Sequence, residues 1–249
     1  MITGIRIDLM RQFRDINTWM FVVVLPCAMV LLFGRIAGQD APDVSTMAMV
    51  ITASMGSFSA ATCAAAISGS SVQESLAGWG RQLALSGQSL TTTVVSKVLV
   101  ATLVSSATTL VVFLCGYLGG AEASSWRIWL YCYLIVLGGS MLFAVYGFAA
   151  VMWFRSETAV GVSASLVTFF GFFGNAFVPL SGSLLDISRF TPMWGYVALA
   201  RYPISEGYAI DGTTVIREEL WWMLLNVGAW LVIFAVAAYL GARRALSQR

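Results

Sequence analysis

Long apolar stretches alternate with short charged segments along the whole of this 249-residue chain. Six stretches exceed the roughly 18 residues that a membrane-crossing helix needs. Apolar residues occupy every face of the stretches, which favours helices over the alternating strands of a membrane barrel. The six predicted spans are Ile16–Gly34, Val44–Gln73, Val98–Ala121, Ile128–Phe154, Thr158–Leu185 and Leu220–Ala242. We therefore predict an all-α polytopic membrane protein with six transmembrane helices, forming one domain over residues 1–249.

Composition and charge agree with this class and predict an orientation. Hydrophobic residues make up 59% of the chain and charged residues 10%, values far from those of soluble domains. With both termini on the cytoplasmic side, nine basic residues lie inside and five lie outside. The positive-inside rule therefore predicts that both termini and the loop Val72–Lys97 are cytoplasmic. No basic patch stands apart from this bias, so nucleic acid is not an expected partner.

Local patterns add detail at the start of the chain. Residues 1–15 predict an interfacial helix on the inner leaflet, equally compatible with a plain anchor and with partner docking. Pro26 is expected to kink the first span. The second span is expected to be buried among other helices because small residues cluster in it. These residues are Ser57, Ala60, Ala61, Ala64, Ala65, Ser68 and Gly69. The four cysteines are typical of apolar packing positions: Cys27, Cys63, Cys115 and Cys132.

Helix breakers interrupt the fifth predicted span. They are Gly171, Gly174, Asn175, Pro179 and Gly182. An unbroken helix is therefore not expected beyond about Phe173. The segment that follows, Ser181–Glu219, is too polar to span a membrane and too apolar to form a free loop. We predict one or two re-entrant or interfacial helices on the outer face there.

The signatures of most enzymes are missing from the chain. It has no histidine, which removes the commonest general base, and no GxxxxGK[ST] phosphate loop. No carboxylate sits at the centre of a span, which weighs against a proton- or sodium-coupled carrier. We predict no catalytic residue, no metal ligand and no cofactor in this chain. If the chain transports a substrate, the energy must then come from a source outside this chain, or the chain forms a passive pore.

The cytoplasmic loop offers a place where energy could enter. Leu76, Trp79 and Leu83 share one face of a short predicted helix. Glu74 and Arg81 face elsewhere, and Ser86-Gly87 ends the helix. This periodicity is compatible with insertion into a groove on a soluble partner and equally with a simple interfacial helix.

Two segments resemble the permease subunits of ABC-2 type (type V) ABC exporters, and the order of elements is similar over the whole chain. In the cytoplasmic loop the similar residues are Gln73-Glu74, Gly78, Gln82-Leu83 and Leu85-Ser86. The loop departs from the family pattern at Leu76, Arg81 and Gly87. After the fifth span, the similar segments are Phe177–Gly182 and Arg189–Trp194.

The resemblance implies a bacterial cytoplasmic-membrane protein that acts as a homo- or heterodimer of permeases. Each permease docks a separate P-loop ATPase, which binds the ATP and Mg²⁺. From the helical face and the resemblance together, the residues predicted to couple to the ATPase are Glu74, Leu76, Gly78, Trp79, Arg81, Gln82, Leu83 and Ser86. Those that the resemblance assigns to the substrate path are Phe169, Phe170, Phe173, Asn175 and Phe177, although such an aromatic run is also typical of lipid-facing or packing positions.

The expected activity is export of an amphipathic cargo, such as an antimicrobial peptide, a drug or a lipid-like molecule. Two other classes of function remain open from the sequence. A passive channel or ion-coupled carrier would move its substrate without an ATPase, and a membrane sensor or scaffold would bind partners and transport nothing.

Overall fold

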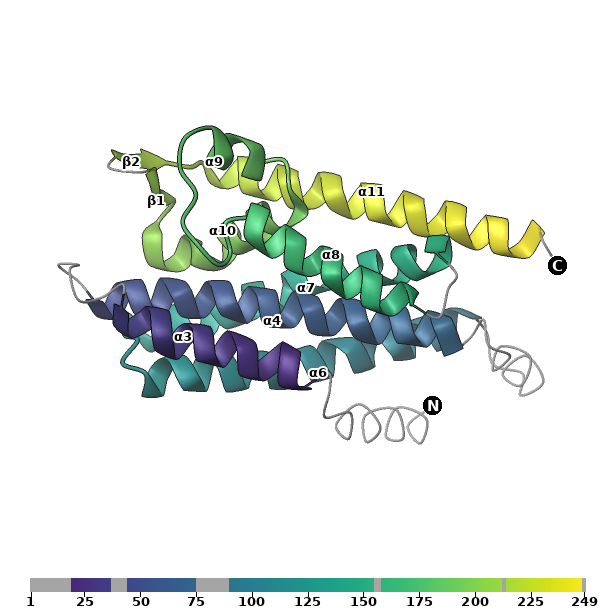
Figure 1. Ribbon diagram of the computed structural model, residues 1–249, viewed down its shortest axis with the longest axis horizontal. Helices are drawn as coiled ribbons and strands as arrows, with labels where there is room; N and C mark the ends of the chain where they lie inside the picture. The colour runs from purple at the N-terminus through teal and green to yellow at the C-terminus, as the bar shows by residue number, and fades with distance from the viewer. Residues whose placement is uncertain (1–18, 37–43, 75–89, 155–157, 212–213, 248–249) are drawn as a thin grey trace.

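The computed structural model describes residues 19–36, 44–74, 90–154, 158–211 and 214–247. Helices dominate these residues (Figure 1). In chain order the elements are η1 (Met20–Val24), α3 (Leu25–Ile36), α4 (Val44–Glu74), α6 (Leu90–Leu118), α7 (Trp126–Phe154), α8 (Ala159–Phe173), α9 (Ser183–Ser188), α10 (Pro192–Ser205), β1 (Tyr208–Asp211), β2 (Thr214–Arg217) and α11 (Leu220–Ser247).

Four helices of the described residues are long and apolar enough to cross a membrane: Ser45–Gln73, Leu99–Leu118, Trp126–Phe154 and Leu220–Arg244. The prediction of a helical membrane protein is therefore confirmed. The first and fifth predicted spans correspond to shorter apolar helices, Val22–Phe33 and Ala159–Phe173. The 15 residues of α8 extend about 22 Å, less than a hydrocarbon core of about 30 Å. Six full spans therefore remain a prediction.

Helix α4 runs through the middle of the molecule, with α3, α6, α7, α8 and α10 packed around it (Figure 1). The small residues expected to be buried in it are all buried. The closest approach is to α7, where a Cβ added to Gly147 would lie 2.2 Å from the carbonyl oxygen of Ala65. Only glycine permits this spacing, so small side chains on both helices set the position of α4.

The helix break after α8 lies where the sequence predicts it. Asn175 has a positive φ of 61°, and the Ala176 amide donates to the carbonyl of Gly171 at 3.0 Å. These two features define a Schellman C-cap, in which a left-handed residue ends the helix. In the first helix, a π-helical turn gives way to α-helix at Leu25, beside Pro26.

Residues 183–217, which we call the cap, form α9, α10 and a small β-hairpin. Helix α10 packs deep against α7: Tyr196 is fully buried, and its hydroxyl donates to the carbonyl of Val136 at 2.6 Å. Val136 lies ten residues into α7, about 15 Å from the start of that helix. The antiparallel hairpin pairs Tyr208 with Arg217 and was not part of the all-helical prediction.

The cap and the C-terminal end of α4 lie at opposite ends of the helix bundle (Figure 1). Glu74, the last residue of α4, lies at the same end as the C-terminal turns of α11, and the hairpin lies at the other (Figure 1). Each long helix therefore connects the two ends.

Candidate functional site

A pocket of about 340 Å³ lies beneath the cap. Its walls come from the first half of α4, the turn after α8, helix α10 and strand β1. Most of the lining is apolar, as with Ile51 and Phe177, but Ser54, Asn175 and Arg201 add polar groups. The Phe177 ring packs edge-on against Phe58 of α4, with ring centroids 4.6 Å apart.

Arg201 connects three of these elements. Its Nε donates a hydrogen bond to Ser54 Oγ at 2.6 Å, and its Nη2 donates to the carbonyl of Asn175 at 2.7 Å. The guanidinium is partly buried, and the guanidinium of arginine stays protonated in proteins. The side chain therefore keeps its positive charge at neutral pH.

The turn after α8 supplies the acceptor that Arg201 needs. The left-handed conformation of Asn175 ends the helix, so its carbonyl is not taken up by a continuing helix. The side-chain Oδ1 of Asn175 accepts from the amide of Leu180 at 3.0 Å and holds the turn. The break that the sequence predicts is thus also the place where α10 is attached.

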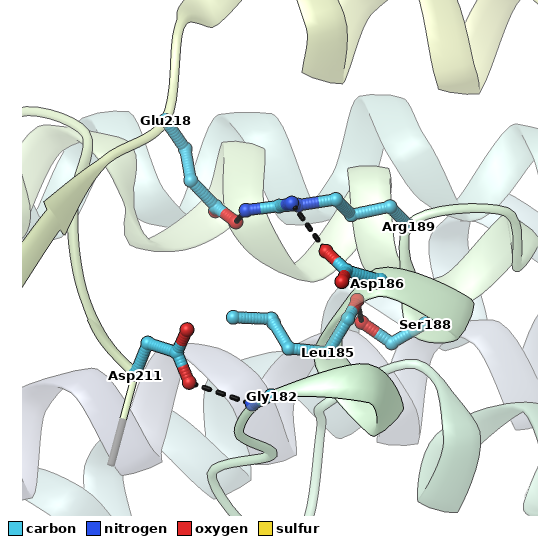
Figure 2. Close-up of polar contacts among 7 residues, drawn as sticks. All are labelled: Gly182, Leu185, Asp186, Ser188, Arg189, Asp211 and Glu218. Carbon is cyan, nitrogen blue, oxygen red and sulfur yellow. Dashed lines mark hydrogen bonds and ion pairs between the residues drawn. The ribbon is translucent and has the colours of Figure 1, made fainter.

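Glu218 lines the same pocket, and its negative charge acts on Arg201. Its side chain is only 8% exposed, and its Oε1 lies 3.5 Å from Nη2 of Arg189. Arg189 also pairs with Asp186 at 2.8 Å (Figure 2). Burial raises the pKa of Glu218, although the positive charges of Arg189 and Arg201 oppose the rise.

Backbone contacts hold the cap in place around these charges. The amide of Gly182 donates to Asp211 Oδ1 at 2.7 Å, which joins the start of α9 to the hairpin (Figure 2). The amide of Glu218 donates to the carbonyl of Gly207 at 2.8 Å. The Arg189 carbonyl accepts from Asn226 Nδ2 at 2.7 Å, which joins the cap to α11.

The substrate-path residues predicted from the sequence separate into two groups. Asn175 and Phe177 line the pocket. Phe170 instead packs against Tyr146, with ring centroids 5.8 Å apart. Phe169 and Phe173 pack against each other with tilted rings, centroids 4.4 Å apart, on an exposed face of α8. The structure therefore brings only two of the five residues to this site.

Of the residues predicted to couple to an ATPase, Glu74 is the last residue of α4. The other seven, Leu76, Gly78, Trp79, Arg81, Gln82, Leu83 and Ser86, lie outside the described residues. Their role stays a prediction. Three residues at the pocket were not singled out from the sequence: Ser54, Arg201 and Glu218. An isolated arginine in the apolar run MWGYVALARY was the available signal for Arg201.

The site is suited to binding rather than to covalent chemistry. It combines one guanidinium, a hydroxyl and backbone carbonyls within apolar walls. Within the described residues, no group of three or more Cys, Asp or Glu side chains could hold a metal ion. The four cysteines are unpaired thiols, three of them buried, in agreement with their predicted packing role.

Comparison with protein-family models and with curated proteins finds no match to this chain.

Proposed function

We propose that this chain is the membrane permease subunit of an ATP-driven exporter, and that the pocket beneath the cap lies on the route of an amphipathic cargo. The observation that carries the proposal is the partly buried, charged Arg201 where α10 meets α4 and the broken end of α8. Ionisable groups at such places in membrane proteins commonly mark substrate pathways. Apolar walls around one cation suit an amphipathic cargo with an anionic or hydrogen-bond-accepting group.

Helix α4 offers a mechanical link between this pocket and a partner in the cytoplasm. Ser54, which accepts the Arg201 hydrogen bond, is 20 residues before Glu74 at the other end of the same helix. This separation is about 30 Å along a continuous helix. A movement of the Val72–Lys97 loop by an ATPase therefore has a direct route to the contact between Ser54 and Arg201.

The subunit composition follows from the resemblance of the loop to ABC-2 permeases. The active unit is a dimer of permeases, with the same or different chains, and each permease carries one P-loop ATPase at its loop. ATP and Mg²⁺ bind in the ATPase. The cytoplasmic membrane, with both termini inside, is the expected location because the basic residues concentrate on that side.

Purification of the chain together with the ATPases encoded beside it tests the proposal. We expect a P-loop ATPase to co-elute, and the substitution Leu83→Asp to abolish co-elution because it places a carboxylate on the apolar face of the loop helix. Ala77→Asp, which introduces the same carboxylate away from the apolar face by helical spacing, is the control and should leave co-elution intact. Absence of any ATPase, with transport persisting without ATP, would identify a channel or carrier instead.

A further inference from the structure

A second and larger groove, of about 1070 Å³, runs between the cap and the first half of α11. Four of the nine tryptophans of the chain line it, so we call it the tryptophan groove: Trp194, Trp221, Trp222 and Trp230. Only 22% of the apolar window of α11 is buried, the lowest share of the four candidate spans. The groove therefore opens on a side of the molecule that the described protein leaves uncovered.

The tryptophans place the groove relative to the membrane. Trp221 and Trp222 stack at 4.2 Å at the start of α11, and both are about half exposed. Paired exposed tryptophans at the end of a span mark a membrane–water interface. The deepest lining residue, Ile233, lies 12 residues beyond Trp221, about 18 Å further along the helix. The groove thus extends from the interface to about the middle of the bilayer, the depth of one lipid leaflet.

The mouth of the groove carries both signs of charge. Five charged side chains line it: Asp186, Arg189, Arg217, Glu218 and Glu219. Two of the carboxylates are exposed, although each has a partner within the protein: Asp186, 71% exposed, pairs with Arg189 at 2.8 Å, and Glu219 accepts from Trp221 Nε1. Arg217 is exposed, with its guanidinium 5.9 Å from the centre of the Tyr208 ring. This mixture complements a head group that carries a positive and a negative charge side by side.

We propose that the tryptophan groove binds one phospholipid with a zwitterionic, ammonium-bearing head group. One acyl chain lies along α11 as far as Ile233. The phosphate lies beside Arg217, and the ammonium lies beside Glu219 and the faces of the neighbouring tryptophans, which attract cations. This site does not depend on the proposed transport function.

Native mass spectrometry of the full-length protein tests the lipid specificity. The delipidated protein is titrated with an ethanolamine phospholipid and with a glycerol phospholipid of the same acyl chains, which has the phosphate without the ammonium. We expect one ethanolamine lipid to bind about tenfold more tightly, since its ammonium gains ion-pair and aromatic contacts. The double substitution Asp186→Asn with Glu219→Gln should remove this preference. Glu122→Gln, an exposed carboxylate at the same end outside the groove, is the control.

A second variant tests the place of binding. Ala229 lines the groove, whereas Ala235 is an exposed alanine of the same helix that does not. Ala229→Trp should displace the bound lipid, and Ala235→Trp should retain it, with both proteins monodisperse. Equal affinity for the two lipids, or a bound lipid that survives Ala229→Trp, overturns the proposal. Conversion of a dimer to a monomer by Ala229→Trp with lipid binding unchanged would assign the groove to a second copy of the chain.

Discussion

The hydrogen bond between Ser54 and Arg201 can be measured by a double-mutant cycle. In the protein, Ser54 Oγ donates to the Val50 carbonyl at 2.6 Å and accepts from Arg201 Nε at 2.6 Å. The substitution Ser54→Ala leaves a buried guanidinium N–H without its acceptor. A hydrogen bond to a charged group contributes about 1.5–3 kcal/mol, so we expect a loss of about 2 kcal/mol. For a chain of this size that loss lowers the unfolding midpoint by about 4–8 °C.

Ser54→Ala should lower the free energy of unfolding only slightly once Arg201 has been replaced. In an Arg201→Met background, Ser54 retains only its bond within the helix, and Ser54→Ala should then cost less than about 0.5 kcal/mol. The assay is thermal unfolding in detergent, followed by tryptophan fluorescence. Ser70→Ala serves as control because the Ser70 hydroxyl bonds to Ile67 of its own helix. An equal cost of Ser54→Ala in both backgrounds would show that the two side chains are not coupled and would refute the pocket geometry.

Three further results are expected. Gly147→Ala should destabilise the protein by about 1–3 kcal/mol in the same unfolding assay, because its Cβ would lie 2.2 Å from a backbone oxygen of α4. Gly138→Ala on the same helix is the control: its Cβ would meet open space, so stability should not change. The pKa of Glu218 is raised in the folded protein, so the folded state keeps this carboxyl protonated at pH values where the unfolded chain has lost the proton. The free energy of unfolding should therefore fall as the pH rises from the ordinary carboxyl pKa through the raised one. Unfolding midpoints measured across pH should show this fall, and Glu218→Gln should reduce it. A cysteine introduced by Ser86→Cys should react only with thiol reagents that reach the cytoplasm, and labelling from outside would invert the topology.

The membrane class and the central helices could be predicted from the sequence because the signal for each is local. Uninterrupted apolar runs identify spans, and small residues such as Ala60 and Ala65 identify the helix that others surround. The helix break at Asn175 could also be predicted, because glycine and proline disturb a helix within one or two turns of their own position. The hairpin was missed because its strands have only four residues each, although a glycine opening a two-residue connection, as in Gly212-Thr213, is a recognised turn signal.

The candidate site was harder to predict because its contacts join distant parts of the chain. Arg201 contacts Ser54, which is 147 residues away in the sequence, and Asn175, which is 26 residues away. Neither contact leaves a spacing pattern in the sequence. Aromatic character alone also could not separate Phe177, which lines the pocket, from Phe169, which is 52% exposed. The direction of each ring depends on where α8 ends and on how α4 packs against it.

Transport in reconstituted vesicles tests the central proposal most directly. The chain is incorporated with its co-purified ATPase, and movement of a fluorescent amphipathic peptide is followed with ATP and with a non-hydrolysable analogue. We predict movement only with ATP, lost in Leu83→Asp and retained in Ala77→Asp. Movement that continues without ATP or without the ATPase would contradict the proposal that this chain is the permease of an ATP-driven exporter.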